Sequence, residues 1–172
     1  SAILNFRLVD TAATNSFLQY YAMNPARTFA ANGELMDPSI IPADCEVLGL
    51  YSKDDYGLDE RVGYLVVKKE VALEGRHIKS AESGSDYTGK PQVNFVLDGE
   101  GAEIFADFTT AHQKEQLAII SDNKVKSYAT IQGPITGGRV AIDGFGLEEA
   151  QNLKKVLQTA WLSVPLTVES QQ

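Results

Sequence analysis

The alternation of apolar and polar residues places a strand at the start of the chain and an irregular segment after it. Residues 3–9, ILNFRLV, alternate well enough to predict a strand with at least one buried face. Residues 13–63 are broken by polar residues and three prolines. We expect a short helix from Ser16 to Met23 there, within a long excursion on one side of the domain.

Strand patterns resume inside and after that excursion. Residues 45–52, CEVLGLYS, and 63–70, GYLVVKKE, are predicted strands separated by a charged turn at 53–61. Residues 74–90 are polar and contain Gly and Ser, which predicts a connector without regular structure.

The second half of the chain carries clearer signals. Val93, Phe95 and Leu97 alternate with other residues, which predicts a strand with these three side chains inward. Asp98 stands where a helix N-cap belongs, because its carboxylate can accept from backbone N–H groups of the first turn. A helix over 99–113 should follow, since its apolar residues fall three and four positions apart.

Further strands and a last helix complete the chain. Residues 116–132 read as a hairpin about a turn at 121–124, where Asp and Asn tolerate positive φ. A short strand is expected at 138–144, a helix with one apolar face at 147–160, and a closing strand at 164–170. Strands and helices thus alternate irregularly, which indicates an α+β fold with a largely antiparallel sheet.

The closely spaced glycines near residue 135 resemble a phosphate-binding loop, but the element predicted to follow them is not the helix that such a loop needs. Such a loop leads directly into a helix N-terminus whose free amides point at the anion. Here Gly133, Pro134, Gly137 and Gly138 are followed by a strand, and the helix begins only near Leu147. The stretch is better explained as a turn in which Gly137 or Gly138 supplies positive φ.

Composition narrows the classes of partner. The chain has 15 Lys+Arg against 23 Asp+Glu, a net charge of −8, which disfavours nucleic acid and anionic lipid. A single cysteine, Cys45, excludes an internal disulfide, and no apolar run approaches the roughly 18 to 20 residues of a membrane span. The chain begins on Ser1 and at once on a strand pattern, so we expect an excised part of a larger protein.

Residues for catalysis or metal binding are few. The histidines, His77 in the predicted connector and His112 at a predicted helix end, form no metal motif, and we expect both to be solvated. A triad of Ser80, His77 and Asp86 can be written, but closeness in sequence does not establish its geometry. We therefore predict no catalytic residue, no metal and no cofactor.

An aromatic group stands out in the excursion. Phe17, Tyr20 and Tyr21 have helical spacing, and Phe29 follows in the loop. The simpler interpretation is that they pin the excursion to the core. The alternative is an exposed apolar face that binds a polypeptide partner.

Three ordered motifs carry a family resemblance. Residues 91–109, PQVNFVLDGEGAEIFADFT, then 117–145, then 147–168 resemble SecD, a membrane protein of bacterial protein export related to the resistance-nodulation-division transporters. Asn123 stands where that family usually has a turn glycine, and Trp161 stands where it has a small residue. Neither departure removes a group on which a reaction would depend.

The resemblance implies an arrangement of subdomains. By it, the chain is most of a large first extracytoplasmic domain, with a ferredoxin-like base that is partly truncated and an inserted α+β head. The head would span about 64–141 and the base about 1–12 and 142–172, leaving 13–63 as an excursion of uncertain assignment. Gly133, Pro134, Gly137 and Gly138 would then form the turn that leads from the head back to the base.

The resemblance also implies a function. The chain would be a non-catalytic periplasmic domain, anchored by membrane helices outside it, that engages emerging unfolded preprotein and assists export driven by the proton gradient. SecF and the SecYEG channel would be partners through the full-length protein. Phe17, Tyr20, Tyr21 and Phe29 are the candidate preprotein contacts.

Two alternatives stay open. A small-molecule-binding domain of a resistance-nodulation-division transporter predicts an enclosed apolar pocket in place of an open groove. A hydrolase built around His77 predicts activity that depends on that side chain.

Overall fold

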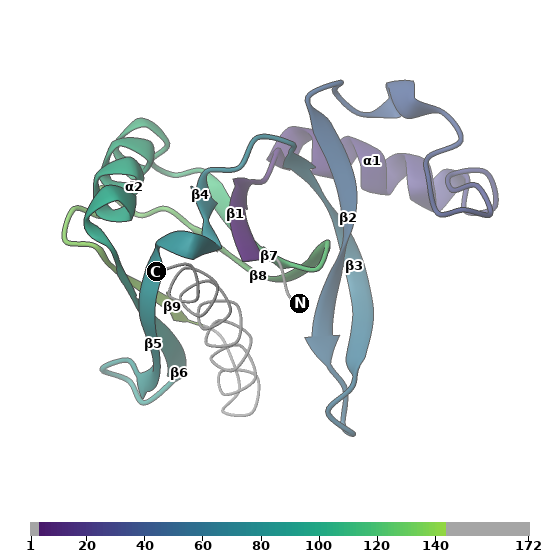
Figure 1. The fold of residues 1–172 in the computed structure, drawn as a ribbon. Helices are drawn as coiled ribbons and strands as arrows, with labels where there is room; N and C mark the ends of the chain where they lie inside the picture. The colour runs from purple at the N-terminus through teal and green to yellow at the C-terminus, as the bar shows by residue number, and fades with distance from the viewer. Residues whose placement is uncertain (1–3, 144–172) are drawn as a thin grey trace, which may run out of the picture.

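The computed structural model describes residues 4–143, and every structural statement below concerns them. Two sheets and two α-helices make up this part of the chain (Figure 1). The strands are β1 (Leu4–Leu8), β2 (Cys45–Lys53), β3 (Asp59–Lys68), β4 (Leu73–Glu74), β5 (Ile78–Ser85), β6 (Pro91–Leu97), β7 (Gln116–Ser121), β8 (Lys124–Thr130) and β9 (Arg139–Asp143). The helices are α1 (Thr11–Met23) and α2 (Gly99–Ala111), with 3-10 turns η1 (Pro38–Ile40) and η2 (Gly75–His77). The predicted α+β class is confirmed, and within 4–143 only β2 and β8 pair in parallel.

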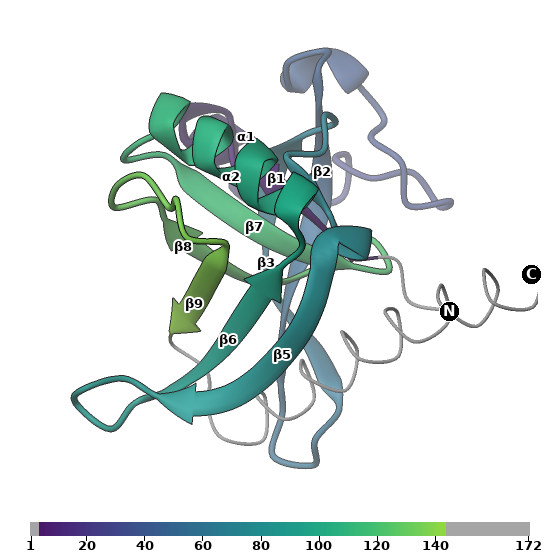
Figure 2. The same cartoon turned by 60° about the vertical axis from the view of Figure 1, so that its left-hand side comes forward.

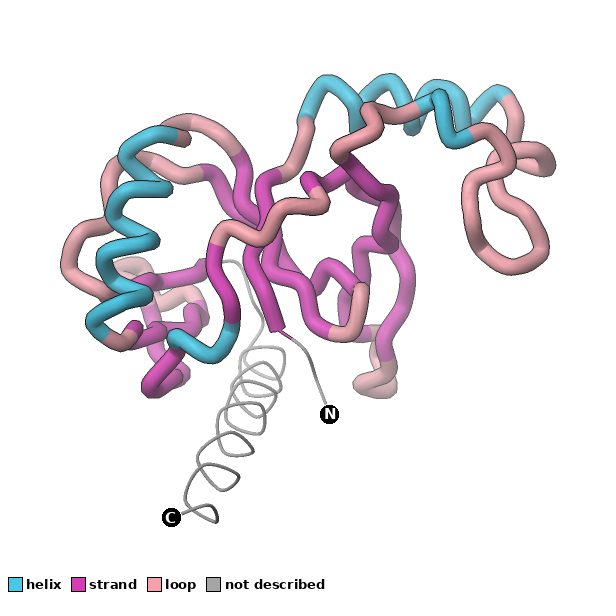
Figure 3. The backbone as a smooth tube through the Cα atoms, turned by 45° about the horizontal axis from the view of Figure 1, so that its top comes forward, coloured by secondary structure: helices cyan, strands magenta, loops and turns pink. Residues whose placement is uncertain are grey.

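The larger sheet curls back on itself. Its order is β3-β2-β8-β7-β1-β4, and the end of β3 returns to β1 through a bridge between Val9 and Val67. The N–H of Asp10 also donates to the carbonyl of Val66 at 2.9 Å. Figures 1 and 3 show the resulting ring of β1, β7, β8, β2 and β3. Its closure pairs strand edges that would otherwise face solvent.

β7 separates two hydrophobic cores. All of its residues after Gln116 are buried, because alternate side chains enter different cores. The ring core lies inside the curled sheet and consists of Val9, Leu48, Leu65, Val67, Ala118, Ile120 and Val125. The interlayer core lies between the two sheets and α2 and consists of Leu4, Phe6, Leu8, Leu73, Ile78, Ala81, Val93, Phe95, Leu97, Phe105, Leu117, Ile119, Ile131, Val140 and Ile142.

The smaller sheet stays open. Its order is β5-β6-β9, and Figure 2 shows β9 at its margin, next to β8. Phe6 of β1 holds the two layers together, since its ring meets Phe95 edge-on at 6.0 Å and Phe105 at 6.1 Å. Such edge-to-face contacts suit the aromatic quadrupole.

Local signals in the second half are confirmed. Val93, Phe95 and Leu97 all point into the interlayer core. Asp98 caps α2, because its Oδ1 accepts from the N–H of Gly101 at 2.7 Å. The β7–β8 turn has φ of 53° at Asp122 and 62° at Asn123, the geometry of a two-residue type I′ hairpin.

Two predictions in the first half are wrong. The helix begins at Thr11 rather than Ser16, because Asp10 caps it by accepting from the N–H of Ala13 at 2.9 Å. The segment 74–90 is not a connector: most of it is β5, paired along β6. Its apolar signal is weak because one face of this edge strand is solvated, and only Ile78 and Ala81 reach the core.

Most of the predicted base lies outside the residues that the structure describes. The last helix at 147–160 and the closing strand at 164–170 lie outside the described residues, so the ferredoxin-like base is not confirmed. Within the described part of the chain, neither helix is long and apolar enough to cross a membrane.

Candidate functional site

A half-open apolar groove runs between the two sheets. It has a volume of about 290 Å³ and lies where β9 faces the end of β8. Phe6, Phe105, Leu117 and Ile119 of the interlayer core line it, together with Ala129 and Thr130 of β8, residues 131–135, and Val140, Ala141 and Ile142 of β9. Pockets for small ligands usually measure roughly 300 to 1,000 Å³. The groove lies at the lower end of that range and has room for a few apolar side chains.

The wall formed by residues 131–138 is tied down at three points. The N–H of Ile131 donates to the carbonyl of Glu115 at 2.8 Å, and the N–H of Ile135 donates to the buried hydroxyl of Thr109 at 2.9 Å. The carbonyl of Gly138 accepts from the N–H of Leu97 at 2.8 Å. These bonds hold the wall of the groove to β6, to α2 and to the segment that precedes β7.

The four residues predicted to form a turn contribute to this wall. Gly133 and Pro134 line the groove. Gly138 has φ of +70°, and a Cβ there would lie 3.1 Å from the Cβ of Ala102, so the position favours glycine. β9, not a helix, follows Gly137 and Gly138, which confirms that the stretch is no phosphate loop. Its role between a head and a base remains a prediction.

Three of the four predicted aromatic residues form one cluster. Phe17, Tyr21 and Phe29 pack on one another and on Tyr64 of β3, with ring centroids 5.1 to 6.1 Å apart. Phe17 is fully buried, whereas Tyr21 and Phe29 are partly exposed. Tyr20 is also partly exposed but makes none of these ring contacts. The cluster pins α1 and the following loop to β2 and β3.

Sequence reasoning missed Tyr64. It lies 43 positions from Tyr21, and the pattern that places it is the alternation of β3, whose buried outer face it shares with Val66. The guanidinium of Arg61 also lies 4.4 Å from its ring centroid. A cation over an aromatic face is favourable, so Arg61 adds to the aromatic contacts that hold Tyr64.

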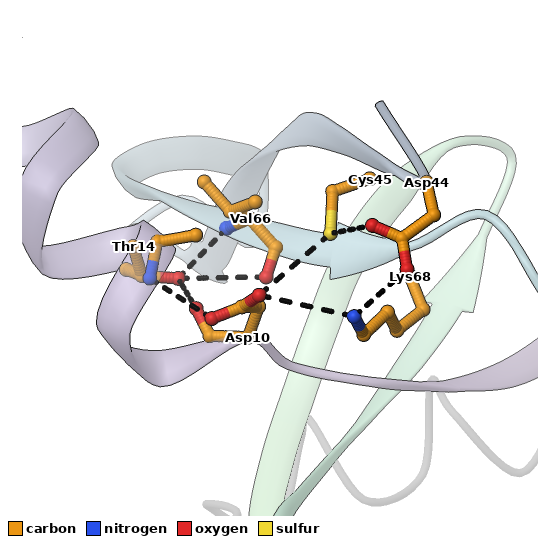
Figure 4. Close-up of polar contacts among 7 residues, drawn as sticks. Asp10, Thr14, Asp44, Cys45, Val66 and Lys68 are labelled. Carbon is orange, nitrogen blue, oxygen red and sulfur yellow. Dashed lines mark hydrogen bonds and ion pairs between the residues drawn. The ribbon is translucent and has the colours of Figure 1, made fainter. Parts of the chain in front are cut away.

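A polar joint fastens α1 to the end of β3 (Figure 4). The hydroxyl of Thr14 accepts from the N–H of Val66 at 2.9 Å and donates to the carbonyl of Asp10 at 2.8 Å. Beside it, the ammonium of Lys68 lies 3.0 Å from the carboxylate of Asp44 and 3.9 Å from that of Asp10. We call this set the α1–β3 joint, and it adds side-chain bonds where the ring closes.

Cys45 lies in the same joint but is not activated. Burial raises the pKa of Cys45 to about 11, and its hydrogen bond to Asp44 adds to that rise. The thiol therefore stays protonated at neutral pH and donates weakly to the carboxylates of Asp44 and Asp10. A protonated, buried thiol is a packing residue, not a nucleophile.

The two histidines differ from each other. His77 is 2% exposed, so the prediction of a solvated residue is wrong for it. Its Nδ1 lies 3.0 Å from Asp98, while Asp86 accepts hydrogen bonds from Thr88 and Lys90 in the β5–β6 turn. The triad of Ser80, His77 and Asp86 is therefore not assembled.

The carboxylate of Asp98, at the start of α2, accepts hydrogen bonds from two donors. Partial burial raises the pKa of Asp98, but the hydrogen bonds from the N–H of Gly101 and from His77 outweigh burial and hold the pKa below its usual value. A Cβ on Gly101 would lie 2.5 Å from that of His77, so glycine allows the close approach. His112 is partly exposed and bonds to Glu115 at 2.7 Å.

Both the sequence and the fold of this chain resemble those of known proteins. Residues 50–164 match the family model of the SecDF P1 head subdomain. The protein translocase subunit SecD of Treponema pallidum is 52% identical over 170 residues, which are 99% of this chain. The chain belongs to the SecD family. The protein translocase subunit SecD of Borreliella burgdorferi is 35% identical over 173 residues, which cover 96% of this chain.

The chain spans 29% of the length of each of these two SecD relatives. Two solved structures also resemble it. A SecDF described as a membrane component that enhances protein export shares 25% identity with a TM-score of 0.54, over 91% of this chain and 61% of that one. A translocon-associated SecDF from Thermus thermophilus gives 25% identity and a TM-score of 0.53, over 94% and 20%.

Proposed function

We propose that this chain is a non-catalytic, periplasmic part of a SecD subunit of the bacterial Sec machinery, and that it engages unfolded preprotein during export. Membership of the SecD family supports the place in protein translocation. The groove between the sheets is the observation that supports the engagement.

The chemistry of the groove fits an unfolded chain. Such a client offers apolar side chains in no fixed order, so a site that accepts many sequences should be apolar and open. The groove is lined by aliphatic and aromatic residues of the interlayer core and is open at the exposed residues Ala129 and Ala141. The alternative, a small-molecule site, calls for an enclosed pocket, and the half-open shape favours a polypeptide.

The aromatic residues of the first half provide a second candidate surface. Tyr21 and Phe29 are partly exposed and pack on the buried ring of Phe17. Tyr20, next to Tyr21 on α1, is also partly exposed. Nearby, Met23 and Met36, the only methionines of the chain, are 82% and 59% exposed. Flexible thioethers suit promiscuous apolar contacts. We propose these side chains as additional preprotein contacts.

SecF and the SecYEG channel are the proposed partners through the full-length subunit. The proton gradient would act on ionisable residues within membrane segments, since charges in such segments mark proton pathways. Residues 4–143 would then serve as the part that holds the client.

A titration tests the proposed function. The 172-residue chain is mixed with a fluorescent synthetic peptide in which Val and Leu alternate with Ser and Thr, and binding is followed by anisotropy. Ala129→Lys places a charge in the groove and should weaken binding by about tenfold, since an apolar partner would have to desolvate it. Tyr21→Ala in the same assay measures the contribution of the aromatic surface.

Tyr128→Lys is the matched control. Tyr128 directly precedes Ala129 in β8, is also exposed, and lies on the opposite face of the strand from Ala129. It should leave affinity within about twofold of the wild type. A wild-type chain that does not bind the peptide, or equal losses in both lysine variants, would count against the proposal.

A further inference from the structure

The free edge of β9 borders the groove. β6 pairs with β9 in antiparallel register, with Val96 opposite Arg139 and Asn94 opposite Ala141. On its other side, β9 pairs with no strand of the described residues. The groove lies on this side, because Ala129 and Thr130 of β8 line it together with Val140, Ala141 and Ile142 of β9. Figure 2 shows β8 beside the margin of β9 that lies away from β6.

The register decides which backbone groups are free. The N–H of Leu97 donates to the carbonyl of Gly138 at 2.8 Å, one step before Val96 and Arg139. Hydrogen-bonded and non-hydrogen-bonded pairs alternate along an antiparallel ladder. The pairs at Arg139 and Ala141 are therefore not hydrogen-bonded, so the N–H and carbonyl groups of these two residues point away from β6.

Side chains on β9 divide in the complementary way. Val140 and Ile142 are buried in the interlayer core, whereas Arg139 and Ala141 are exposed. A strand added beside β9 would place alternate side chains on the same face as Val140 and Ile142. Those side chains would enter the groove, while the others would face solvent.

We propose that an extended segment of the preprotein pairs with β9 as an additional strand, with its alternate apolar side chains in the groove. This inference rests on the proposed function and specifies its mode of recognition. Backbone groups at Arg139 and Ala141 repeat every second residue, and the partner that matches this spacing is another extended backbone. Since the hydrogen bonds involve no side chain of the client, many sequences are accepted.

The other edges of the described sheets are less suited. The end of β3 is occupied by its bridge to β1, and β4 is two residues long. β5 lies at the opposite margin of the smaller sheet, and none of its residues lines the apolar groove. β9 is the edge that combines free backbone groups with an apolar groove.

Ala141→Pro tests the pairing without cutting the β6–β9 ladder. Proline removes the outward N–H of residue 141 and is tolerated in edge strands at such positions. Binding of the alternating peptide should fall by about tenfold, because a hydrogen bond is lost and the proline ring obstructs the approaching strand. Ala141→Thr keeps the N–H and is the control, with an expected change within about twofold.

Peptides methylated on alternate backbone nitrogens supply a second measurement on the wild-type chain. Methylation of the amides that face β9 should abolish binding, and methylation of the other amides should leave it nearly unchanged. This arm holds even where Ala141→Pro fails to fold, which thermal unfolding by circular dichroism would reveal.

The outcomes separate the two proposals. If Ala129→Lys weakens binding while Ala141→Pro and both methylated peptides bind like their controls, the groove holds the client without strand pairing, and this inference is overturned. No binding by the wild type would instead overturn the proposed function. A wild-type dimer in sedimentation that Ala141→Pro converts to a monomer would assign the edge to a second copy and also overturn this inference.

Discussion

The two sheets of this molecule treat their edges in opposite ways. In the larger sheet, the end of β3 meets β1 and the ring closes. In the smaller sheet, β9 pairs on one side with β6, and no strand within residues 4–143 pairs with its other side, which borders the groove. An exposed strand edge can pair with another chain and so promote aggregation. An open edge next to an apolar surface is therefore unfavourable unless it serves to bind a partner. This contrast agrees with our proposal that the ring is a scaffold and that the open sheet carries the binding surface.

The ring closes with little backbone pairing at two places. β2 and β8 share one pair, Leu50 with Val125, and β1 meets β3 at the single bridge beside Val67. Side chains support both places. The α1–β3 joint supports the bridge, and Asp59 bonds to lysines of β2 and β8 near the other. Substitutions in the shared core, at the α1–β3 joint and at Asp59 should therefore affect the two sheets to different extents.

Phe6→Ala should have the largest effect because Phe6 belongs to the core that both sheets share. Its ring is fully buried against Phe95 and Phe105. Removing a buried phenyl group costs about 3 to 5 kcal/mol of unfolding free energy. Urea denaturation followed by circular dichroism measures this loss, and Phe6→Leu should cost clearly less. Two separate transitions in the wild type would show that the sheets unfold independently, against the shared core.

Thr14→Val should have an intermediate effect confined to the ring. The substitution keeps the shape but leaves the buried N–H of Val66 without its acceptor, which costs about 1 to 3 kcal/mol. Hydrogen exchange of the Val66 amide should accelerate, while the Phe95 amide of the open sheet should change less. Thr14→Ser retains the hydroxyl and should restore most of the protection. Unchanged exchange at Val66 would mean that the joint does not hold the ring closed.

Local features of both halves were predictable from sequence. The cap of α2 at Asp98 and the left-handed turn at Asp122 and Asn123 could be predicted, because each depends only on neighbours within three or four positions. The short strand expected at 138–144 is β9, and the structure places Val140 and Ile142 in the interlayer core. The same rule could have extended α1 back to Thr11, since Asp10 is an ordinary N-cap signal.

The features that could not be predicted from the sequence depend on contacts between segments that are distant in the chain. His77 is buried because β5 and the start of α2 meet there, which a polar sequence at 74–90 conceals. Tyr64 joins the aromatic cluster across the fold, and the groove exists only once β8 and β9 belong to different sheets. Composition and periodicity describe one element at a time, so they cannot locate a surface shared by two.

Asp59→Asn should have the smallest effect, and its pH dependence makes it specific. Asp59 lies 2.7 Å from Lys53 and 2.6 Å from Lys126. Partial burial raises the pKa of Asp59, but the hydrogen bonds from Lys126 and Lys53 outweigh burial and hold it well below the usual range. A carboxyl whose pKa is lowered by folding stabilises the fold above its unfolded pKa, near 3.9, and loses that contribution as pH falls through the folded value.

The difference between wild type and Asp59→Asn should therefore be about 1 kcal/mol at pH 7 and shrink progressively below about pH 4. Urea denaturation at a series of pH values measures it. Asp55→Asn, in the same turn and outside this lysine cluster, should show little difference at any pH. Added salt should also reduce the effect, because the pairs are partly solvated. A difference that persists unchanged in acid would mean that shape or packing at Asp59, and not its charge, supports the place where β2 and β8 diverge.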